Sequence, residues 1–308
     1  MIIGTVGEMW RYPVKSMGGE RLDRCPVGIT GLLGDRGWAM RDDVAGEIRG
    51  ARHFPPLLRC SARYREPPGE GPLPPVEITL PDGTHVGSDA PEVHTRLSAL
   101  VGHSVSLWPL QPASHKAHYR RAYAGARLMG QLSRFRLFRK ALRRILPYTS
   151  WEASARALLG REPGEPLPDI ALFPAALFEF TSLPGTYFDA FPLHLLTTAS
   201  LSAMARFNPS ATWDVRRFRP NLLIATDDNW EGLVEAGWSG RTLRMGELVV
   251  QCEMPTARCR MTMQAQAELA NDPTVLRTIV REAGQQLGIY ASVIHPGRVA
   301  LDDVVELL

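Results

Sequence analysis

The chain has 308 residues, a formal net charge of +3 and 44% hydrophobic residues, which fits one large or two ordinary globular domains. No run of about 18 apolar residues occurs, and the N-terminus lacks a basic region followed by an apolar core, so we expect neither a transmembrane helix nor a signal peptide. The four cysteines do not suggest a disulfide framework, and Cys252 and Cys259 lack the spacing of a CxxC zinc site. A reducing cytoplasm is therefore the expected compartment.

The first third of the chain predicts short strands separated by turns. Strands are expected within residues 2–10, 22–27, 57–65, 76–87 and 105–108, and a helix within 89–101. The turn Pro81-Asp82-Gly83-Thr84 predicts a hairpin inside 76–87. This pattern is typical of an all-β or barrel-like domain.

Two polar loops between these strands carry basic residues. One spans residues 11–20 and contains Lys15 and Ser16 between Pro13 and a Gly-Gly pair. The other spans residues 31–37 and contains Arg36. Each loop could bind an anion, and each is also compatible with ordinary solvated surface charge.

Residues 93–151 contain eleven Lys and Arg and no Asp or Glu, whereas the rest of the chain has 24 basic and 32 acidic residues. Apolar residues at helical spacing predict one basic amphipathic helix over 127–146, ended by Pro147. The alternatives are a solvated surface helix, a contact with a membrane surface, a dock for an acidic partner and a lid. A Pro/Gly-rich linker at 161–166 follows, and no nucleic-acid-binding motif accompanies the charge.

The second half begins with a predicted strand at 191–196 and a helix that runs to Phe207. Thr198 is the predicted N-cap, and hydroxyls at a helix N-terminus form a candidate anion site. Arg216, Arg217 and Arg219 then precede an apolar strand at 222–225. Further strand-like segments at 238–243 and 246–250 lead toward Cys259.

Cys259 lies in a short loop after an apolar strand. Pro255 cannot donate to a β-ladder, so it ends this strand or lies at a sheet edge. Arg258 and Arg260 flank the cysteine and favour the thiolate, which is both a nucleophile and a metal ligand. The alternative is a buried structural cysteine near a salt bridge.

A helix and a hairpin are predicted after this loop. Asp272 and Pro273 are typical of an N-cap and the first helical position, and an apolar face continues to Leu287 before Gly288 ends the helix. Residues 289–308 predict a closing hairpin. No dinucleotide-binding, phosphate-loop or HExxH motif is present.

Six motifs, taken together, make the chain resemble one family. They are Tyr12-Pro13-Val14-Lys15-Ser16, Gly34-Asp35-Arg36, Leu196-Thr197-Thr198-Ala199-Ser200-Leu201, Arg217-Phe218-Arg219-Pro220-Asn221, Arg258-Cys259, and Gly288-Ile289-Tyr290 before a Pro-Gly turn. In this order they resemble the MOSC proteins, related to the C-terminal part of molybdenum cofactor sulfurase, and especially the amidoxime-reducing component and its bacterial relatives. The resemblance implies a mainly β, α+β fold: an N-terminal MOSC β-barrel domain (1–110), a basic helical insert and linker (111–170) and a MOSC β-barrel domain (171–308).

The resemblance also implies a site for the molybdenum cofactor (molybdopterin). Cys259 matches the catalytic cysteine whose sulfur binds molybdenum. Residues at positions matching the cofactor-binding segments are Lys15, Ser16, Arg36, Thr197, Thr198, Ser200, Arg219, Asn221, Arg258 and Tyr290. We therefore expect Lys15, Arg36 and Arg219 to share one cavity with Cys259, and the basic helix to cover or border its mouth. A cysteine often found just upstream of the Arg-Cys pair in the reductase branch is Thr256 here.

The implied function is a molybdenum cofactor-dependent oxidoreductase that reduces N–O bonds of small N-hydroxylated molecules with electrons from a separate protein. Two alternatives stay open. One is a sulfur carrier or sulfurtransferase with a persulfide on Cys259, and the other is a non-catalytic cofactor-binding module. No nucleic acid partner is expected, and segment 127–146 is a candidate for peripheral membrane contact.

Overall fold

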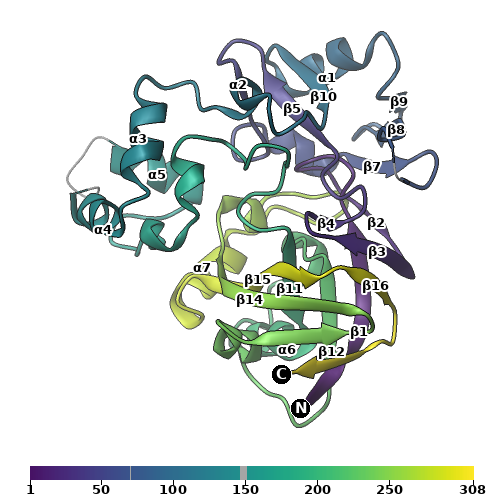
Figure 1. The fold of residues 1–308 in the computed structure, drawn as a ribbon, viewed down its shortest axis with the longest axis vertical. Coiled ribbons are helices and arrows are strands. Elements are labelled where there is room, and N and C mark those ends of the chain that lie inside the picture. Colours follow the sequence, from purple (N-terminus) through teal and green to yellow (C-terminus); the bar gives the residue numbers. More distant parts are fainter. Residues whose placement is uncertain (70, 146–150) are drawn as a thin grey trace.

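The structure is a computed structural model that describes residues 1–69, 71–145 and 151–308. Its largest unit is a seven-stranded barrel in the order β12-β11-β15-β14-β13-β17-β1, closed by pairing of β12 with β1. Its strands are β1 (Ile2–Arg11), β11 (Leu193–Thr197), β12 (Leu222–Thr226), β13 (Thr242–Met245), β14 (Leu248–Ala257), β15 (Gln286–His295) and β17 (Val304–Leu307). Both termini lie on this barrel (Figure 1) because β1 pairs with β17. The predicted mainly β, α+β fold with a barrel is confirmed.

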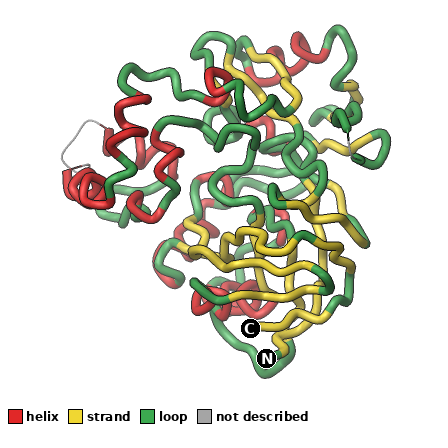
Figure 2. The backbone as a smooth tube through the Cα atoms, in the orientation of Figure 1, coloured by secondary structure: helices red, strands yellow, loops and turns green. Residues whose placement is uncertain are grey.

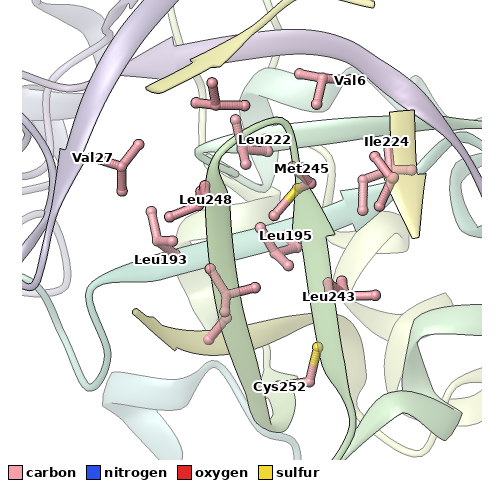
Figure 3. Close-up of a cluster of buried hydrophobic side chains, with 14 of the residues drawn as sticks. Val6, Val27, Leu193, Leu195, Leu222, Ile224, Leu243, Met245, Leu248 and Cys252 are labelled. Atoms are coloured by element: carbon pink, nitrogen blue, oxygen red, sulfur yellow. The ribbon is translucent and has the colours of Figure 1, made fainter. Parts of the chain in front are cut away.

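Alternating side chains fill the barrel interior with apolar groups. Along β14, Leu248, Val250 and Cys252 are fully buried, whereas the residues between them are partly exposed. Figure 3 shows Leu248 and Cys252 in one cluster with Leu195 of β11, Leu222 of β12 and Leu243 of β13. Pro255 lies beyond Gln251, the last β14 residue that pairs with β13, so it occupies the predicted sheet edge.

Three small sheets lie beside the barrel, in the orders β10-β5-β6, β7-β8-β9 and β16-β3-β4, and all of their strands except the C-terminal β16 come from the N-terminal region. Their elements are β3 (Arg24–Gly28), β4 (Gly31–Leu32), β5 (Trp38–Asp42), β6 (Glu47–Ile48), β7 (Ser61–Tyr64), β8 (Val76–Thr79), β9 (His85–Gly87), β10 (Val105–Pro109) and β16 (Gly297–Ala300), with β2 (Glu20–Arg21) on β1 and helix α1 (Val93–Val101) alongside. Ile3 and Val6 of β1 and Val27 of β3 belong to the barrel core, so residues 1–110 contribute to two cores.

The predicted strand at 57–65 is only partly correct. Residues 57–59 belong to a 3-10 helix, η1 (Pro55–Arg59), and the strand begins at Ser61. Two consecutive prolines start η1, and their missing N–H groups suit the first positions of a helix. The predicted hairpin across residues 76–87 is present as β8 and β9.

The insert contains α2 (Lys116–Tyr119), α3 (Ala126–Leu132), α4 (Arg136–Ile145), α5 (Trp151–Leu159), η3 (Ile170–Leu172) and η4 (Ala175–Phe178). Helix α2 lies against β6, whereas Figure 2 shows α3, α4 and α5 apart from the strands. The prediction of one helix over 127–146 is wrong within the described residues, because the chain breaks between α3 and α4; residue 146 lies outside them. Ser133 is buried there, and Leu128 and Phe135 of the predicted apolar stripe are 57% and 67% exposed. In the part of the chain that the structure describes, no helix combines the length and apolarity needed to cross a bilayer.

Two helices cover the outside of the barrel. Met204 of α6 (Thr198–Phe207) and Val275 and Ile279 of α7 (Pro273–Glu282) pack with Leu196 and Leu223. Short 3-10 helices η5 (Val215–Arg217), η6 (Val234–Trp238) and η7 (Arg260–Met263) complete this half.

The boundaries of these helices correct two predictions. The N-cap of α6 is Thr197 rather than Thr198, because the Thr197 side chain accepts the Ser200 N–H. Asp272 caps α7 as predicted, but α7 ends at Glu282 rather than at Gly288. Gly284 and Gln285 follow with φ of 53° and 66°, a left-handed pair that stops the helix and starts β15.

Gly288 lies inside β15 at a point of close approach. Its φ is 81°, and a Cβ at this position would lie 2.2 Å from Nε2 of His194 on the neighbouring strand β11. Gly284 also has a positive φ, of 53°, but a Cβ there would have open space. Gly288 therefore has a packing constraint that Gly284 lacks.

We predict that Gly288→Ala lowers the free energy of unfolding by about 1–3 kcal/mol more than Gly284→Ala, because overpacking adds to the left-handed strain of about 1–2 kcal/mol that both variants share. Urea denaturation of both variants measures the difference. Equal losses would contradict the close approach between β15 and β11.

Candidate functional site

A cavity of about 80 Å³ lies between the N-terminal loops and one end of the barrel. Eight predicted site residues line it: Lys15, Ser16, Arg36, Arg219, Asn221, Arg258, Cys259 and Tyr290. Lys15, Arg36 and Arg219 therefore line one cavity with Cys259, as expected.

Three of these residues have unusual backbone conformations. Ser16, Arg36 and Arg219 have φ of 73°, 50° and 55°, and they account for three of the six described non-glycine residues with positive φ. The left-handed conformation costs about 1–2 kcal/mol per residue and is often retained where a ligand is bound. Its concentration around one cavity makes this cavity the candidate functional site.

Arg219 is a buried cation with an unused donor. Its guanidinium carbon lies 4.1 Å from the centre of the Tyr12 ring, and Nη1 donates to the carbonyl of Met17. Nη2 is buried and has no hydrogen-bond partner in the described chain. Burial lowers the pKa of Arg219 to about 10, so the side chain stays charged at neutral pH. A charged donor in this setting fits an anionic ligand.

Arg258 and Thr256 add further unused polar groups. Nη2 of Arg258 donates to the carbonyl of Phe218 at 2.7 Å, and Nη1 lies 3.3 Å from Nε2 of His194. Nε of Arg258 and Oγ1 of Thr256 are buried, and neither finds a partner among the described residues. Both residues line the cavity, so three of its side chains carry an unsatisfied polar atom.

The other cations are oriented by protein groups. Arg36 pairs with Asp35, which also accepts from Nδ2 of Asn221 at 3.0 Å. Arg217 donates to the carbonyls of Thr212 and Ala270, so it holds the loops behind the cavity. Asn221 accepts the His194 N–H at 3.1 Å, which ties this group to β11.

Asp189 is a cavity residue that the sequence patterns did not reveal. Its Oδ1 accepts from Nζ of Lys15 at 2.6 Å, and Arg52 lies 3.9 Å away. Desolvation raises the pKa of Asp189, but Lys15 and then Arg52 lower it more, so the net shift is downward. The Asp189 side chain is 48% exposed and that of Lys15 only 11%, which puts the carboxylate at the outer edge of the pair. Among the described lining residues, Asp189 is the one carboxylate beside five Lys and Arg.

Cys259 differs from the other three cysteines. All four are free, and Cys25, Cys60 and Cys252 are buried, whereas Cys259 is partly exposed on the cavity. Burial raises the pKa of the Cys60 and Cys252 thiols to about 12. Cys259 is thus the candidate cysteine for reaction or metal binding, and it is not the buried residue that the alternative required.

The insert supports the Cys259 loop through a second residue that sequence reasoning missed. Arg161 is buried, and its Nη2 donates to the carbonyl of Arg258 at 2.8 Å and to Oε1 of Gln285 at 3.2 Å. Gly160 lies against Arg260. The end of α5 therefore borders the loop, whereas neither α3 nor α4 supplies a described residue to the cavity.

Three predicted ligands are used elsewhere in the fold. Thr197 and Ser200 donate to the buried carboxylate of Glu235 at 2.7 and 2.5 Å, and Thr198 bonds to Thr226 at 3.0 Å. All three are described residues, and none lines the cavity. The prediction that they contribute to the anion site is therefore not supported by this geometry, because their hydroxyls join α6 to η6 and β12.

A larger cavity of about 460 Å³ meets the first one at Arg219. Its lining includes Trp10, Tyr12 and Arg216 but not Cys259. Arg216 forms ion pairs with Asp214 and Glu268, so its charge is already matched. The smaller cavity is the better candidate for chemistry, since it holds the thiol and the unsatisfied donors.

The fold and this cavity define a barrel protein with an additional N-terminal β region and a thiol at the junction of the two. Two family models match the chain: the MOSC domain matches residues 184–306, and the MOSC N-terminal beta barrel domain matches residues 3–107. The chain belongs to the MOSC family, with both domains present.

Two solved structures illustrate the similarity to known proteins. The YuaD protein from Bacillus subtilis is 11% identical, with a TM-score of 0.44, over 99% of this chain and 94% of that chain. YiiM from Escherichia coli is 22% identical, with a TM-score of 0.30, over 38% of this chain and 54% of that chain. A comparison with curated proteins finds no match.

We predict that His194 makes the protein less stable below about pH 6.5. Burial, and then Arg258, lower the pKa of His194 well below its usual value, whereas the unfolded chain takes up its proton near pH 6.5. The stability contributed by the neutral ring is complete above pH 6.5 and is lost as the pH falls. In urea denaturation between pH 7.5 and about 5, His194→Gln should flatten this decline, and His115→Gln, at an exposed site, should not. Parallel curves for all three proteins would contradict the assignment.

We also predict that the cavity binds inorganic phosphate through Arg219. Hydrogen bonds to charged groups contribute about 1.5–3 kcal/mol, so Arg219→Gln should weaken phosphate binding by roughly 10- to 150-fold. Arg216→Gln is the matched control and should leave the affinity unchanged. Isothermal titration calorimetry measures both, and similar losses in the two variants would move the anion site away from the Cys259 cavity.

Proposed function

We propose that the cavity binds the molybdenum cofactor and that Cys259 is the protein ligand to the metal. MOSC domains are associated with binding of this cofactor, and both MOSC domains match the chain. The observation that carries the proposal is the meeting of a partly exposed thiol with buried, unsatisfied N–H groups of Arg219 and Arg258 in one cavity. Soft metals favour thiolate ligands, and phosphate favours guanidinium donors.

The described residues fit the two ends of such a group. Arg219, Arg258 and Lys15 would hold the phosphate, with Arg36 and Asn221 oriented beside them by Asp35. Tyr290 would supply an aromatic wall, since its ring lies 5.6 Å from Phe191 and burial raises its pKa to about 12, which keeps it neutral. A ligand of pterin size is larger than this cavity of about 80 Å³ and would extend beyond it.

We further propose that the protein is an oxidoreductase that reduces N–O bonds of N-hydroxylated small molecules. The bound cofactor supplies the two-electron redox chemistry, and electrons come from a separate protein. The residues of the chain would orient the cofactor through Arg219 and Arg258 and would keep the thiol of Cys259 at the open side of the cavity. A reducing, cytoplasmic compartment suits this thiol, and all four cysteines are free.

A sulfur carrier is the second candidate function. The partial exposure of Cys259 and the cations around it also suit a persulfide, which would need no molybdenum. Metal content and labile sulfur distinguish the two functions. A non-catalytic module would bind molybdenum without turnover.

We predict that wild-type protein, expressed with an intact cofactor supply, retains stoichiometric molybdenum and reduces a hydroxylamine-type substrate with an artificial electron donor. Cys259→Ala should lose turnover while keeping the fold, because a partly exposed loop thiol contributes little to the core. Cys252→Ala is the control: it creates a core cavity and lowers stability but should retain metal and turnover.

Mass spectrometry measures the molybdenum content of each protein, and a cyanide-release assay measures its labile sulfur. Labile sulfur on Cys259 without molybdenum would favour the sulfur carrier. Full molybdenum-dependent turnover by Cys259→Ala would refute the assignment of Cys259 as the essential ligand.

A further inference from the structure

One face of α4 exposes cations and large apolar side chains together. Arg136, Lys140 and Arg144 are exposed and four residues apart, so they form one row along the helix. Leu137, which is 81% exposed, lies in the adjacent row, and Phe135, which is 67% exposed, directly precedes the helix. We call these five residues the α4 patch.

The α4 patch faces away from the rest of the protein. The opposite side of α4 is held by Phe138 and Leu142, which are half-buried, and by Arg139, whose Nη1 donates to the carbonyl of Phe173 at 2.9 Å. Figure 1 shows α3 and α4 at the outer side of the insert, away from the barrel. The insert is therefore anchored by one side of α4 and leaves the other open.

The cations of this surface are not neutralised by described residues. Arg136, Lys140 and Arg144 have no ion pair with any described carboxylate, nor do Arg127 and Arg134, which are exposed on and just after α3. Glu152, the first acidic residue after position 92, is occupied by Arg156 at 2.8 Å. These five cations make the local field positive, and Leu128 of α3 and Leu137 of α4 are exposed on the same two helices.

We propose that the α4 patch docks the protein on an anionic lipid bilayer. Cations attract the headgroups, and Phe135 and Leu137 enter the boundary between headgroups and acyl chains. A second copy of the chain fits poorly, because a symmetric contact would bring the same cations together. An acidic protein surface would match the cations but would not bury the two large apolar side chains. An anionic bilayer does both, so it matches the α4 patch better.

Docking would also set the orientation of the cavity. The insert reaches the Cys259 loop through Arg161, whose Nη2 donates to the carbonyl of Arg258 at 2.8 Å. The bilayer contact and the cavity then belong to connected parts of one structure. The proposal does not depend on which cofactor the cavity holds.

The test is co-sedimentation of the full chain with phosphatidylcholine vesicles, with and without phosphatidylglycerol. We expect binding only to the anionic vesicles, weakening as salt rises well above 0.15 M, where the Debye length is about 8 Å. Arg136→Gln with Lys140→Gln should weaken binding by roughly tenfold or more. Phe135→Ser with Leu137→Ser should also weaken it. The control, Arg206→Gln with Arg281→Gln, removes two exposed cations on α6 and α7 and should bind like the wild type.

Three results would overturn the proposal. The first is no binding to anionic vesicles at low salt. The second is equal loss in the patch and control variants. The third is binding that persists in the Phe135/Leu137 variant and is matched by polyglutamate, which would identify a purely electrostatic surface for an acidic protein. Circular dichroism of each variant verifies that it is folded.

Discussion

The site depends on the contact between Arg219 and the loop that carries Tyr12 and Met17. An uncompensated buried charge costs several kcal/mol, yet Arg219 is only 8% exposed and keeps its charge. The Tyr12 ring at 4.1 Å and the Met17 carbonyl offset part of this cost, and Nη2 is left for a ligand. Because Tyr12 follows β1 and Arg219 precedes β12, the paired strands β1 and β12 hold the contact in place.

Further contacts link the surroundings of Arg219 to the loop that carries the Cys259 thiol. Asn221 links Asp35, the partner of Arg36, to the backbone of His194, and His194 in turn lies 3.3 Å from Arg258, the neighbour of Cys259. Gly288 lets β15 approach His194. These contacts connect three barrel strands and two N-terminal loops, so protein groups hold the cations and the thiol close together.

The sequence predicted those parts of the fold and site that have a local signal. Turn residues marked the loops of Lys15 and Arg36, and Pro255 marked the part of β14 that lies at the sheet edge before Cys259. Asp189 and Arg161 carry no such signal, because their partners lie 174 and 97 residues away in the chain. The sequence could not assign the partner of Thr197 and Ser200, because hydroxyls at the start of a helix give the same pattern whether they bind a ligand or a buried carboxylate such as Glu235. The prediction of one helix over 127–146 was wrong because the helical spacing of apolar residues did not reveal the turn at buried Ser133.

We propose above all that Cys259 supplies a sulfur ligand to the molybdenum of a cofactor whose phosphate is held by the neighbouring cations. X-ray absorption at the molybdenum edge, on wild-type protein and on Cys259→Ser, tests it most directly. The account predicts that the variant loses one sulfur neighbour of the metal, whereas Cys252→Ser keeps the wild-type spectrum. An unchanged sulfur shell in Cys259→Ser would contradict it.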